Sequence, residues 1–289
     1  MKLIGKTNFD FMGNRKIFYA LSILVILSGM ISIYIKGLNL GLDFTGGTLL
    51  QVSFTDKMDI QQLRKFLKSG DIEASIRSFE GNSYAILIKG KQENVNEYAN
   101  KVIEIFNKND IKFTEEKRDF VGPVVGKELT KKAVFAIVLS MFGIIVYIAF
   151  RFANPVWGIT GVIALLHDIL VATAAMSLTN REIDLVIVAA LLTIAGYSIN
   201  DTIVIYDRIR ENTKKFPKMP LKDLINTGIN ETLSRTIITV LTVIFVLVVI
   251  YLFGGSAIND FAFCMLVGNI SGVYSTIAIA TSLGYDWQK

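Results

Sequence analysis

An aspartate stands inside a long apolar segment in the second half of the chain. The segment begins near Leu185 and runs to Tyr206, and Asp201 belongs to its apolar part. Asp207 begins the charged edge that follows, which puts Asp201 roughly 9 Å inside that edge if the segment is helical. An ionisable carboxyl at this depth is costly in lipid and therefore faces a partner or a wet cavity. The residue is a protonatable group on an ion path, an aspartate near a helix end that reaches up to the headgroups, or a polar group paired only to hold two helices together.

A second polar site lies near the middle of another apolar run, where His167 is followed by Asp168. Neighbouring residues on a helix point about 100° apart, so both side chains can approach one interior face. Histidine titrates near neutral pH, and either group could change its charge in the physiological range. The alternative, to which we give equal weight, is a hydrogen-bonding pair between helices that stays neutral.

Asp201 has a candidate counter-charge and several polar neighbours. Arg235 stands where the fifth apolar run begins, on the same side of the membrane, although an interfacial arginine also reaches the headgroups on its own. The nearby hydrogen-bonding groups are Ser198, Asn200 and Thr202, and Ser198 lies one helical turn before Asp201 on the same face. We therefore expect these residues to surround the carboxyl and support it.

Residues for covalent catalysis or metal binding are scarce. The chain has one histidine and one cysteine, Cys264, which lies in an apolar run. Nothing in the sequence resembles a nucleophile–base arrangement, and one histidine does not supply a zinc site. One cysteine gives no disulfide framework. We expect no enzyme activity, no metal site and no cofactor other than a coupling ion.

The composition is that of a membrane protein, because 52% of the 289 residues are hydrophobic. Apolar runs of spanning length occur at 17–35, 133–150, 156–178, 185–206, 236–253 and about 261–283. They predict a first transmembrane helix at 17–36 and five more within 133–283. The last run is the least regular, because small and polar residues such as Asn269, Ser271 and Gly272 dilute it. The first run is too long for a signal peptide and lacks a cleavage site, so we expect it to remain as an anchor.

Basic residues gather on one side of the predicted spans. The loop at 207–235 and the segment at 1–16 are rich in Lys and Arg, whereas the loop at 179–184 is acidic. Because positively charged loops stay in the cytoplasm, this loop, the N-terminal segment and the tail at 284–289 are predicted to be cytoplasmic. Helical spacing at 221–233 predicts a short amphipathic helix at the cytoplasmic face. The net charge of +5 thus reports orientation and does not indicate nucleic-acid binding.

The segment 37–132 is then the one sizeable domain outside the cytoplasm. Its patterns predict strands at 48–54, 72–79, 84–88 and 111–121, helices at 59–68 and 94–107, and a hairpin turn at 80–83. This β-α-β-β-α-β order is the ferredoxin-like arrangement. Gly46 and Gly47 precede a strand and no helix, so we interpret them as a tight bend and not as a phosphate loop. The predicted fold is a polytopic α-helical membrane protein of six transmembrane helices, with one α+β ferredoxin-like extracytoplasmic domain between the first two.

Several blocks of sequence resemble the signature of a known family. They are GLDFTGGT at 41–48, VGPVVGKEL at 121–129, LHD at 166–168 and GYSINDTIVIYDR at 196–208. With FDF at 9–11 and TLSR at 232–235, they resemble the SecF family in the right order over nearly the whole chain. SecF is the smaller subunit of the SecDF protein-export complex, within the resistance-nodulation-division (RND) superfamily. The residues marked by the resemblance are Asp43, Gly46, Gly47, Gly122, Pro123 and Gly126.

The resemblance implies a bacterial inner-membrane subunit that pairs with a separate SecD and works beside the SecYEG channel. It implies that the proton-motive force, or sodium in some members, helps to draw an unfolded polypeptide outward after translocation driven by SecA and ATP. YajC and YidC are further implied partners, as is membrane lipid. The matching residues would place Asp201 and Arg235 on the ion path, with Asp168 a weaker candidate.

Two other functions stay open. A small-molecule or lipid exporter of the RND class normally has two six-span halves in one chain and larger outside domains, whereas this chain has one half and a small domain. A non-transporting scaffold of the channel would use Asp201 only for helix packing. A larger six-span partner encoded alongside would argue against the exporter, and replacing Asp201 by Asn would separate the scaffold from an ion-driven subunit.

Overall fold

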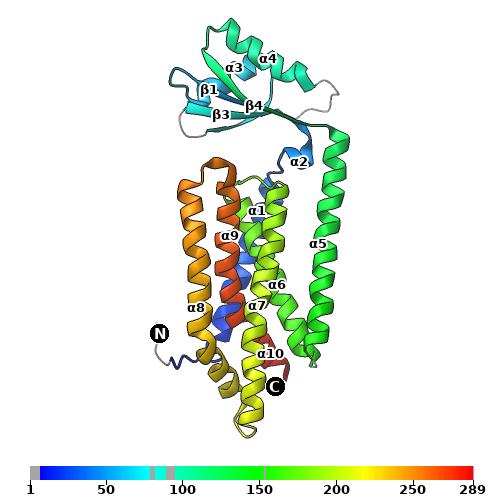
Figure 1. The fold of residues 1–289 in the computed structure, drawn as a ribbon, viewed down its shortest axis with the longest axis vertical. Coiled ribbons are helices and arrows are strands. Elements are labelled where there is room, and N and C mark those ends of the chain that lie inside the picture. Colours follow the sequence, from blue (N-terminus) through cyan, green and yellow to red (C-terminus); the bar gives the residue numbers. More distant parts are fainter. Residues whose placement is uncertain (1–6, 79–81, 89–94, 153, 289) are drawn as a thin grey trace.

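The computed structural model describes residues 7–78, 82–88, 95–152 and 154–288, and it consists of a bundle of long helices and a small domain at one end of it (Figure 1). The chain enters the small domain from α1 (Arg15–Lys36) and returns to the bundle through α5 (Pro123–Arg151). Both described chain ends lie at the far end of the bundle from the small domain (Figure 1). The domain is thus inserted between the first two long helices.

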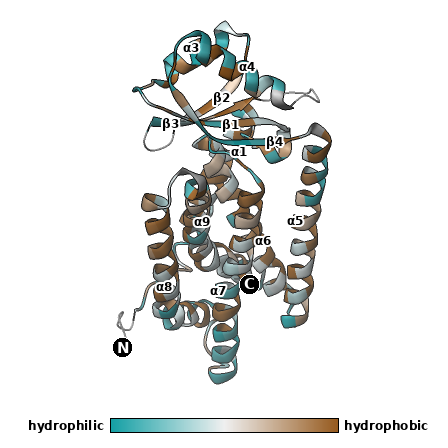
Figure 2. Ribbon diagram, turned by 45° about the horizontal axis from the view of Figure 1, so that its top comes forward, coloured by the Kyte–Doolittle hydropathy of each residue, from teal (hydrophilic) through white to brown (hydrophobic). Residues whose placement is uncertain are grey.

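Six helices in the described part of the chain are long and apolar enough to cross a membrane. After α1 and α5 come α6 (Pro155–Leu178), α7 (Leu185–Lys215), α8 (Leu221–Phe253) and a last helix of three parts, which are α9 (Ser256–Ser275), a π-helical turn (Thr276–Ala280) and α10 (Thr281–Gln288). Each corresponds to one of the six predicted apolar runs. Hydrophobic residues predominate along these helices (Figure 2), as expected for segments in contact with lipid.

Several helices extend beyond the apolar runs that predicted them. α5 begins at Pro123 instead of near 133, and α8 begins at Leu221. The prediction of a separate amphipathic helix at 221–233 is therefore wrong, because that stretch forms the first turns of α8. Its apolar residues Ile225 and Ile229 are fully buried against the C-terminal half of α7. Packing on a neighbouring helix prolongs a helix past the length that hydropathy alone detects.

The predicted tail at 284–289 is also not a free segment. Residues up to 288 belong to α10, and Asp286 accepts hydrogen bonds from Arg15 Nε at 2.9 Å and from the Tyr19 hydroxyl at 3.1 Å. The end of the last helix is thereby fixed to the start of α1.

Small residues allow the helices to approach closely. A Cβ added to Gly29 of α1 would collide with the Cβ of Ala174 in α6, and one added to Gly268 of α9 would collide with Ile194 in α7. Such contacts replace hydrophobic driving force in membranes, where lipid tails are as apolar as leucine. α6, α7 and the last helix are the most buried, whereas α1, α5 and α8 lie at the periphery.

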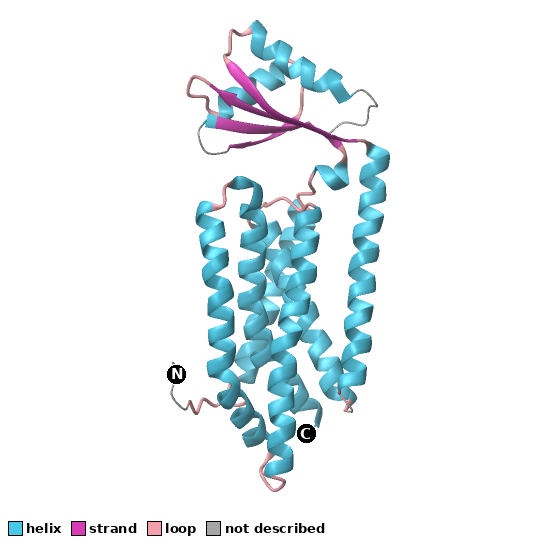
Figure 3. Ribbon diagram, in the orientation of Figure 1, coloured by secondary structure: helices cyan, strands magenta, loops and turns pink. Residues whose placement is uncertain are grey.

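The small domain is a four-stranded sheet with two helices. Its strands are β1 (Gly47–Phe54), β2 (Ala74–Ser78), β3 (Ser83–Ile88) and β4 (Phe113–Val121), and its helices are α3 (Ile60–Ser69) and α4 (Val95–Lys108). The strand order is β2-β3-β1-β4, and all neighbours are antiparallel. Both helices cover the sheet face that points away from the bundle (Figure 3). The elements follow one another in the predicted β-α-β-β-α-β order, and part of the predicted hairpin at 80–83 lies outside the described residues.

The core of this domain lies between the sheet and the two helices. Leu50 and Val52 of β1, Leu63 of α3 and Phe106 of α4 are fully buried there. The Phe106 ring packs edge-on against Phe54 and Phe113, with centroids 5.4 and 5.2 Å away. Alternate residues of β1 therefore face the helices, as the period of two predicts.

A short helix, α2 (Leu42–Thr45), joins the small domain to the bundle and was not predicted. Asp43 of α2 accepts a hydrogen bond at 3.0 Å from the backbone N–H of Leu185. Leu185 is the first residue of α7. Gly41 N–H donates to the Ile183 carbonyl at 2.8 Å. Burial, and then the nearby charge of Asp43, raise the pKa of Asp184, which caps the same helix end through the Ile187 N–H. The contacts of Gly41 and Asp43 with Ile183 and Leu185, which we call the joint, fix α2 to the N-terminus of α7.

The motif glycines complete the joint. Gly46 and Gly47 have φ of 67° and 135°, which side chains rarely adopt, so the predicted tight bend is confirmed. A Cβ on Gly126 of α5 would lie 3.2 Å from the backbone N of Gly46. Gly122 is the N-cap of α5 and Pro123 its first residue, a position where a missing N–H costs nothing. The two glycine-containing blocks are therefore in contact.

We expect residues 46–122 to fold as an independent domain whose core depends on Phe106. Phe106→Ala removes a fully buried ring and should cost about 3–5 kcal/mol, which is comparable with the whole stability of so small a domain. Phe120→Ala, at a ring that is 37% exposed, is the matched control and should retain a cooperative urea transition by circular dichroism. A disordered spectrum for the parent fragment would contradict the prediction.

A second prediction concerns the hydrogen bond that Asp43 accepts at the joint. Asp43→Ala leaves the Leu185 N–H without an acceptor, and losing such a cap costs about 1 kcal/mol, or roughly fivefold in local opening. Hydrogen exchange of the Leu185 amide in the full chain should accelerate by about that factor. Asp184→Ala is the control, because it should accelerate Ile187 and spare Leu185. Unchanged exchange at Leu185 in Asp43→Ala would show that the cap does not hold the helix end.

Candidate functional site

Asp168 of α6 is completely buried within the bundle, and hydroxyl groups surround its carboxylate. Ser271 Oγ donates to Oδ1 at 2.6 Å, and Ser198 Oγ and Ser275 Oγ each donate to Oδ2 at 2.6 Å. His167 Nδ1 lies 3.1 Å from Oδ1. Since the hydroxyls come from α7 and α9, one carboxylate ties three helices together. We call these five residues the Asp168 cluster.

His167 extends the cluster to α1. Its Nε2 lies 3.1 Å from Ser22 Oγ, which in turn lies 3.0 Å from the hydroxyl of Tyr274 in α9. The Tyr274 hydroxyl donates to the carbonyl of Phe18 at 2.6 Å. His167 and Asp168 therefore share one interior site, as their adjacent positions on a helix predicted.

Asp201 lies on α7 one turn beyond Ser198, and its environment is different. The residue is 8% exposed, yet among the described residues its carboxylate has no hydrogen-bond donor and no ion-pair partner. Arg235 of α8 is exposed and attracts the carboxylate electrostatically without contacting it. The proposed counter-charge therefore acts at longer range and not as an ion pair.

The polar residues expected to support Asp201 are turned elsewhere. Ser198 donates to Asp168, and the Thr202 hydroxyl lies 2.8 Å from that of Thr276 in the π-helical turn. Asn200 is exposed on the outer surface of the bundle. The expectation that these groups surround Asp201 is wrong, because helical steps of about 100° send successive side chains to different neighbours.

Sequence reasoning missed several members of the Asp168 cluster. Ser271 and Ser275 of the cluster were not predicted as site residues, and neither were Ser22 and Tyr274, which extend it beyond His167. The sequence does contain a pattern that indicates them, because polar residues such as Asn269 and Ser271 interrupt the last apolar run. A hydroxyl group in a spanning segment donates either to a carbonyl of its own helix, as Thr193 does, or to a partner inside the bundle, and a buried carboxyl on another helix is such a partner.

The motif residues around Gly46 and Gly126 are not part of either polar site. They lie at the joint, where Asp43 caps α7. Asp201 is sixteen residues further along the same helix than Leu185, or about 24 Å at 1.5 Å per residue. α7 thus connects the joint to the unpaired carboxyl.

Two families match the chain. Residues 101–289 match the family described as protein export membrane protein SecD/SecF, C-terminal, and residues 31–57 match the SecD/SecF GG motif. The second match contains Gly46 and Gly47 of the joint. The first match covers α5 to α10 and thus both polar sites.

Whole proteins match as well. The chain is 41% identical to protein translocase subunit SecF of Endomicrobium trichonymphae over 100% of this chain and 94% of that protein, and 42% identical to SecF of Calditerrivibrio nitroreducens over 96% and 94%. A crystal structure of SecDF from Thermus thermophilus, described as a translocon-associated membrane protein, superposes with a TM-score of 0.88 at 34% identity. That match covers 98% of this chain and 39% of the longer SecDF chain. The chain belongs to the SecF family of protein translocase subunits.

Proposed function

We propose that this chain pairs with a SecD protein beside the SecYEG channel and uses the proton-motive force to promote polypeptide export after the step driven by SecA and ATP. It carries no catalytic activity of its own in this proposal. The chain lies in the bacterial inner membrane with both termini cytoplasmic, and its small domain is a ferredoxin-like domain on the outside. In this proposal YajC and YidC belong to the same assembly.

The observation that carries the proposal is the contrast between two carboxyls. Asp168 and Asp201 are the acidic residues in the apolar middle of the described spans, and Asp168 accepts hydrogen bonds from three serines. Asp201 has no such donor within the described parts of the chain, so its oxygens are free to take and release a cation. An intramembrane carboxyl without a partner is expensive, which favours a functional reason for it. Asp201 is therefore our coupling group, and Arg235 modulates it electrostatically.

The surroundings of Asp201 favour a proton over sodium. A dehydrated metal ion needs several oxygen ligands in place of its water shell. Ser198 and Thr202 turn their hydroxyls to other partners, and Asn200 faces outward. A proton needs only the carboxylate oxygen itself.

α7 offers a route from the ion to the outside domain. The helix carries Asp201, and its first residue, Leu185, donates to Asp43 at the joint. A change in α7 when Asp201 loads or releases a proton therefore acts on α2 and, through Gly46 and Gly126, on the start of α5. In this proposal the small domain moves with α7.

An exposed face of α7 supports the pairing with SecD. Thr193, Gly196 and Asn200 lie on this face, and Asn200 projects an amide outward at the depth of Asp201. An amide facing lipid at that depth is costly, and a small residue such as Gly196 allows a second helix to approach. We assign this face to a SecD helix.

Asp201→Asn should abolish the stimulation of export by an imposed pH gradient and leave export driven by ATP alone unchanged. Asparagine keeps the shape but binds no proton. Arg235→Ala should also lose the stimulation, and Arg235→Lys should keep part of it because the charge remains. The measurement is export into vesicles that contain the channel, SecA, SecD and this chain, with pH and sodium gradients imposed separately.

Asp207→Asn is the matched control, since Asp207 lies on the same helix in an ion pair with Arg151 at the charged edge. It should retain the gradient response, because asparagine can still accept a hydrogen bond from Arg151 and the residue lies outside the apolar middle of the helix. If export with the Asp201→Asn chain is still fully stimulated by the gradient, Asp201 is not the coupling group and the chain acts as a non-transporting scaffold. A response to sodium but not to pH would replace the proton by sodium.

The orientation makes a separate prediction. In a Cys264→Ala background, a cysteine at exposed Lys65 of α3 should react with a membrane-impermeant maleimide added to cells with a permeable outer membrane. A cysteine at exposed Lys218, in the basic loop, should react only after lysis. The opposite pattern would reverse the topology.

A further inference from the structure

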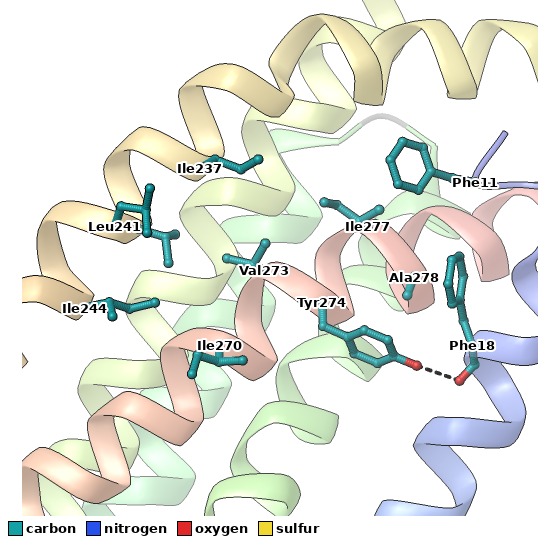
Figure 4. Close-up of a pocket in the computed structure, with 11 residues that line it drawn as sticks. Phe11, Phe18, Ile237, Leu241, Ile244, Ile270, Val273, Tyr274, Ile277 and Ala278 are labelled. Carbon is teal, nitrogen blue, oxygen red and sulfur yellow. Dashed lines mark hydrogen bonds between the residues drawn. The ribbon is translucent and has the colours of Figure 1, made fainter. Parts of the chain in front are cut away.

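The hydrogen bonds around His167 fix the direction in which each proton points. Figure 4 shows the start of the chain of bonds, where the Tyr274 hydroxyl points to the carbonyl of Phe18 at 2.6 Å. A carbonyl can only accept, so the single hydroxyl proton of Tyr274 lies on that bond. Ser22 Oγ lies 3.0 Å from the same hydroxyl and must therefore donate to it.

The direction of these bonds also determines which nitrogen of the His167 imidazole donates. Because the Ser22 proton is used toward Tyr274, His167 Nε2 at 3.1 Å must donate to Ser22 Oγ. In a neutral ring the other nitrogen, Nδ1, would then carry a bare lone pair. Nδ1 lies 3.1 Å from Asp168 Oδ1, so a lone pair there would face a carboxylate oxygen. One additional proton is required between the two side chains.

The serines indicate on which side that proton sits. Ser198, Ser271 and Ser275 all donate to the Asp168 oxygens at 2.6 Å. An ionised carboxylate is an acceptor only, and it offers about four lone-pair sites, which three hydroxyls and one N–H fill. The arrangement thus suits a carboxylate next to an imidazolium.

We propose that His167 and Asp168 form a proton-binding site that holds one proton on Nδ1 as an imidazolium–carboxylate pair and, in that form, joins α1, α6, α7 and α9. The pair has no net charge while the proton is bound. Loss of the proton leaves a negative charge in the bundle and turns the contact at Nδ1 into a repulsion. The packing of α1 against α6 through Ser22 therefore depends on occupancy of this site.

Few other ionisable groups of the described residues act on the pair. α9 contributes Tyr274, and α1 contributes the neutral hydroxyl of Ser22. α7 contributes Ser198, with Asp201 one turn beyond it. The ring also borders an apolar cavity of about 340 Å³ between α1, α6 and α9, lined in part by Val25 and Val267, which offers it no competing partner. The inference stands whether or not Asp201 couples an ion.

The test uses the fact that His167 is the only histidine of the chain. The full chain, labelled with ¹⁵N-histidine and placed in lipid nanodiscs, gives one pair of ring-nitrogen signals. At neutral pH both nitrogens should be in the protonated range. In Asp168→Asn, Nδ1 should lose its proton while Nε2 keeps its own, because Ser22 still accepts from it. A wild-type spectrum with either nitrogen unprotonated would overturn the proposal.

Ser22→Ala provides a milder variant in case Asp168→Asn does not assemble. It removes the acceptor of Nε2 and leaves Asp168 in place, so only the Nε2 signal should shift and Nδ1 should stay protonated. Loss of the Nδ1 proton in Ser22→Ala, or an Asp168→Asn spectrum identical to wild type, would contradict the assignment. The readout is spectroscopic, so it is independent of export and of any result on Asp201.

Discussion

A buried carboxylate in a membrane must find its hydrogen-bond donors within the protein, and Asp168 finds them on two other helices. Removing one partner would leave polar groups unpaired in hydrocarbon, which costs more than the bond itself contributes. The positions of α6, α7 and α9 are therefore set by a polar contact as much as by small-residue packing such as that of Gly268 on Ile194. The rest of the bundle assembles around this core.

α7 is the element that relates the two ends of the molecule. Its first residue is held by Asp43 at the joint, its middle by the Asp168 cluster through Ser198, and the part beyond its apolar run by the ion pair of Asp207 with Arg151. Asp201 lies between the last two contacts.

The sequence alone was sufficient for the architecture. Apolar length located the six long helices, and alternation within 37–132 located the strands and helices of the small domain in their correct order. The sequence patterns were insufficient where packing between distant segments determines the bounds of an element. The local pattern predicts a separate helix at the first turns of α8, because it does not contain the burial of Ile225 and Ile229 against α7. α2 was missed because four residues carry no periodicity.

For the polar sites, the sequence determined which ionisable residues lie in the membrane, because each interrupts an apolar run. It could not determine their partners. Ser198 is one turn from Asp201 in the sequence yet donates to Asp168, and the serines that complete that cluster lie about a hundred residues away on α9. Only the tertiary structure separated a carboxylate saturated with hydrogen bonds from an unpaired one. The reason is physical: the cost of a charge in a membrane depends on its neighbours in space, and a single chain's sequence does not record them.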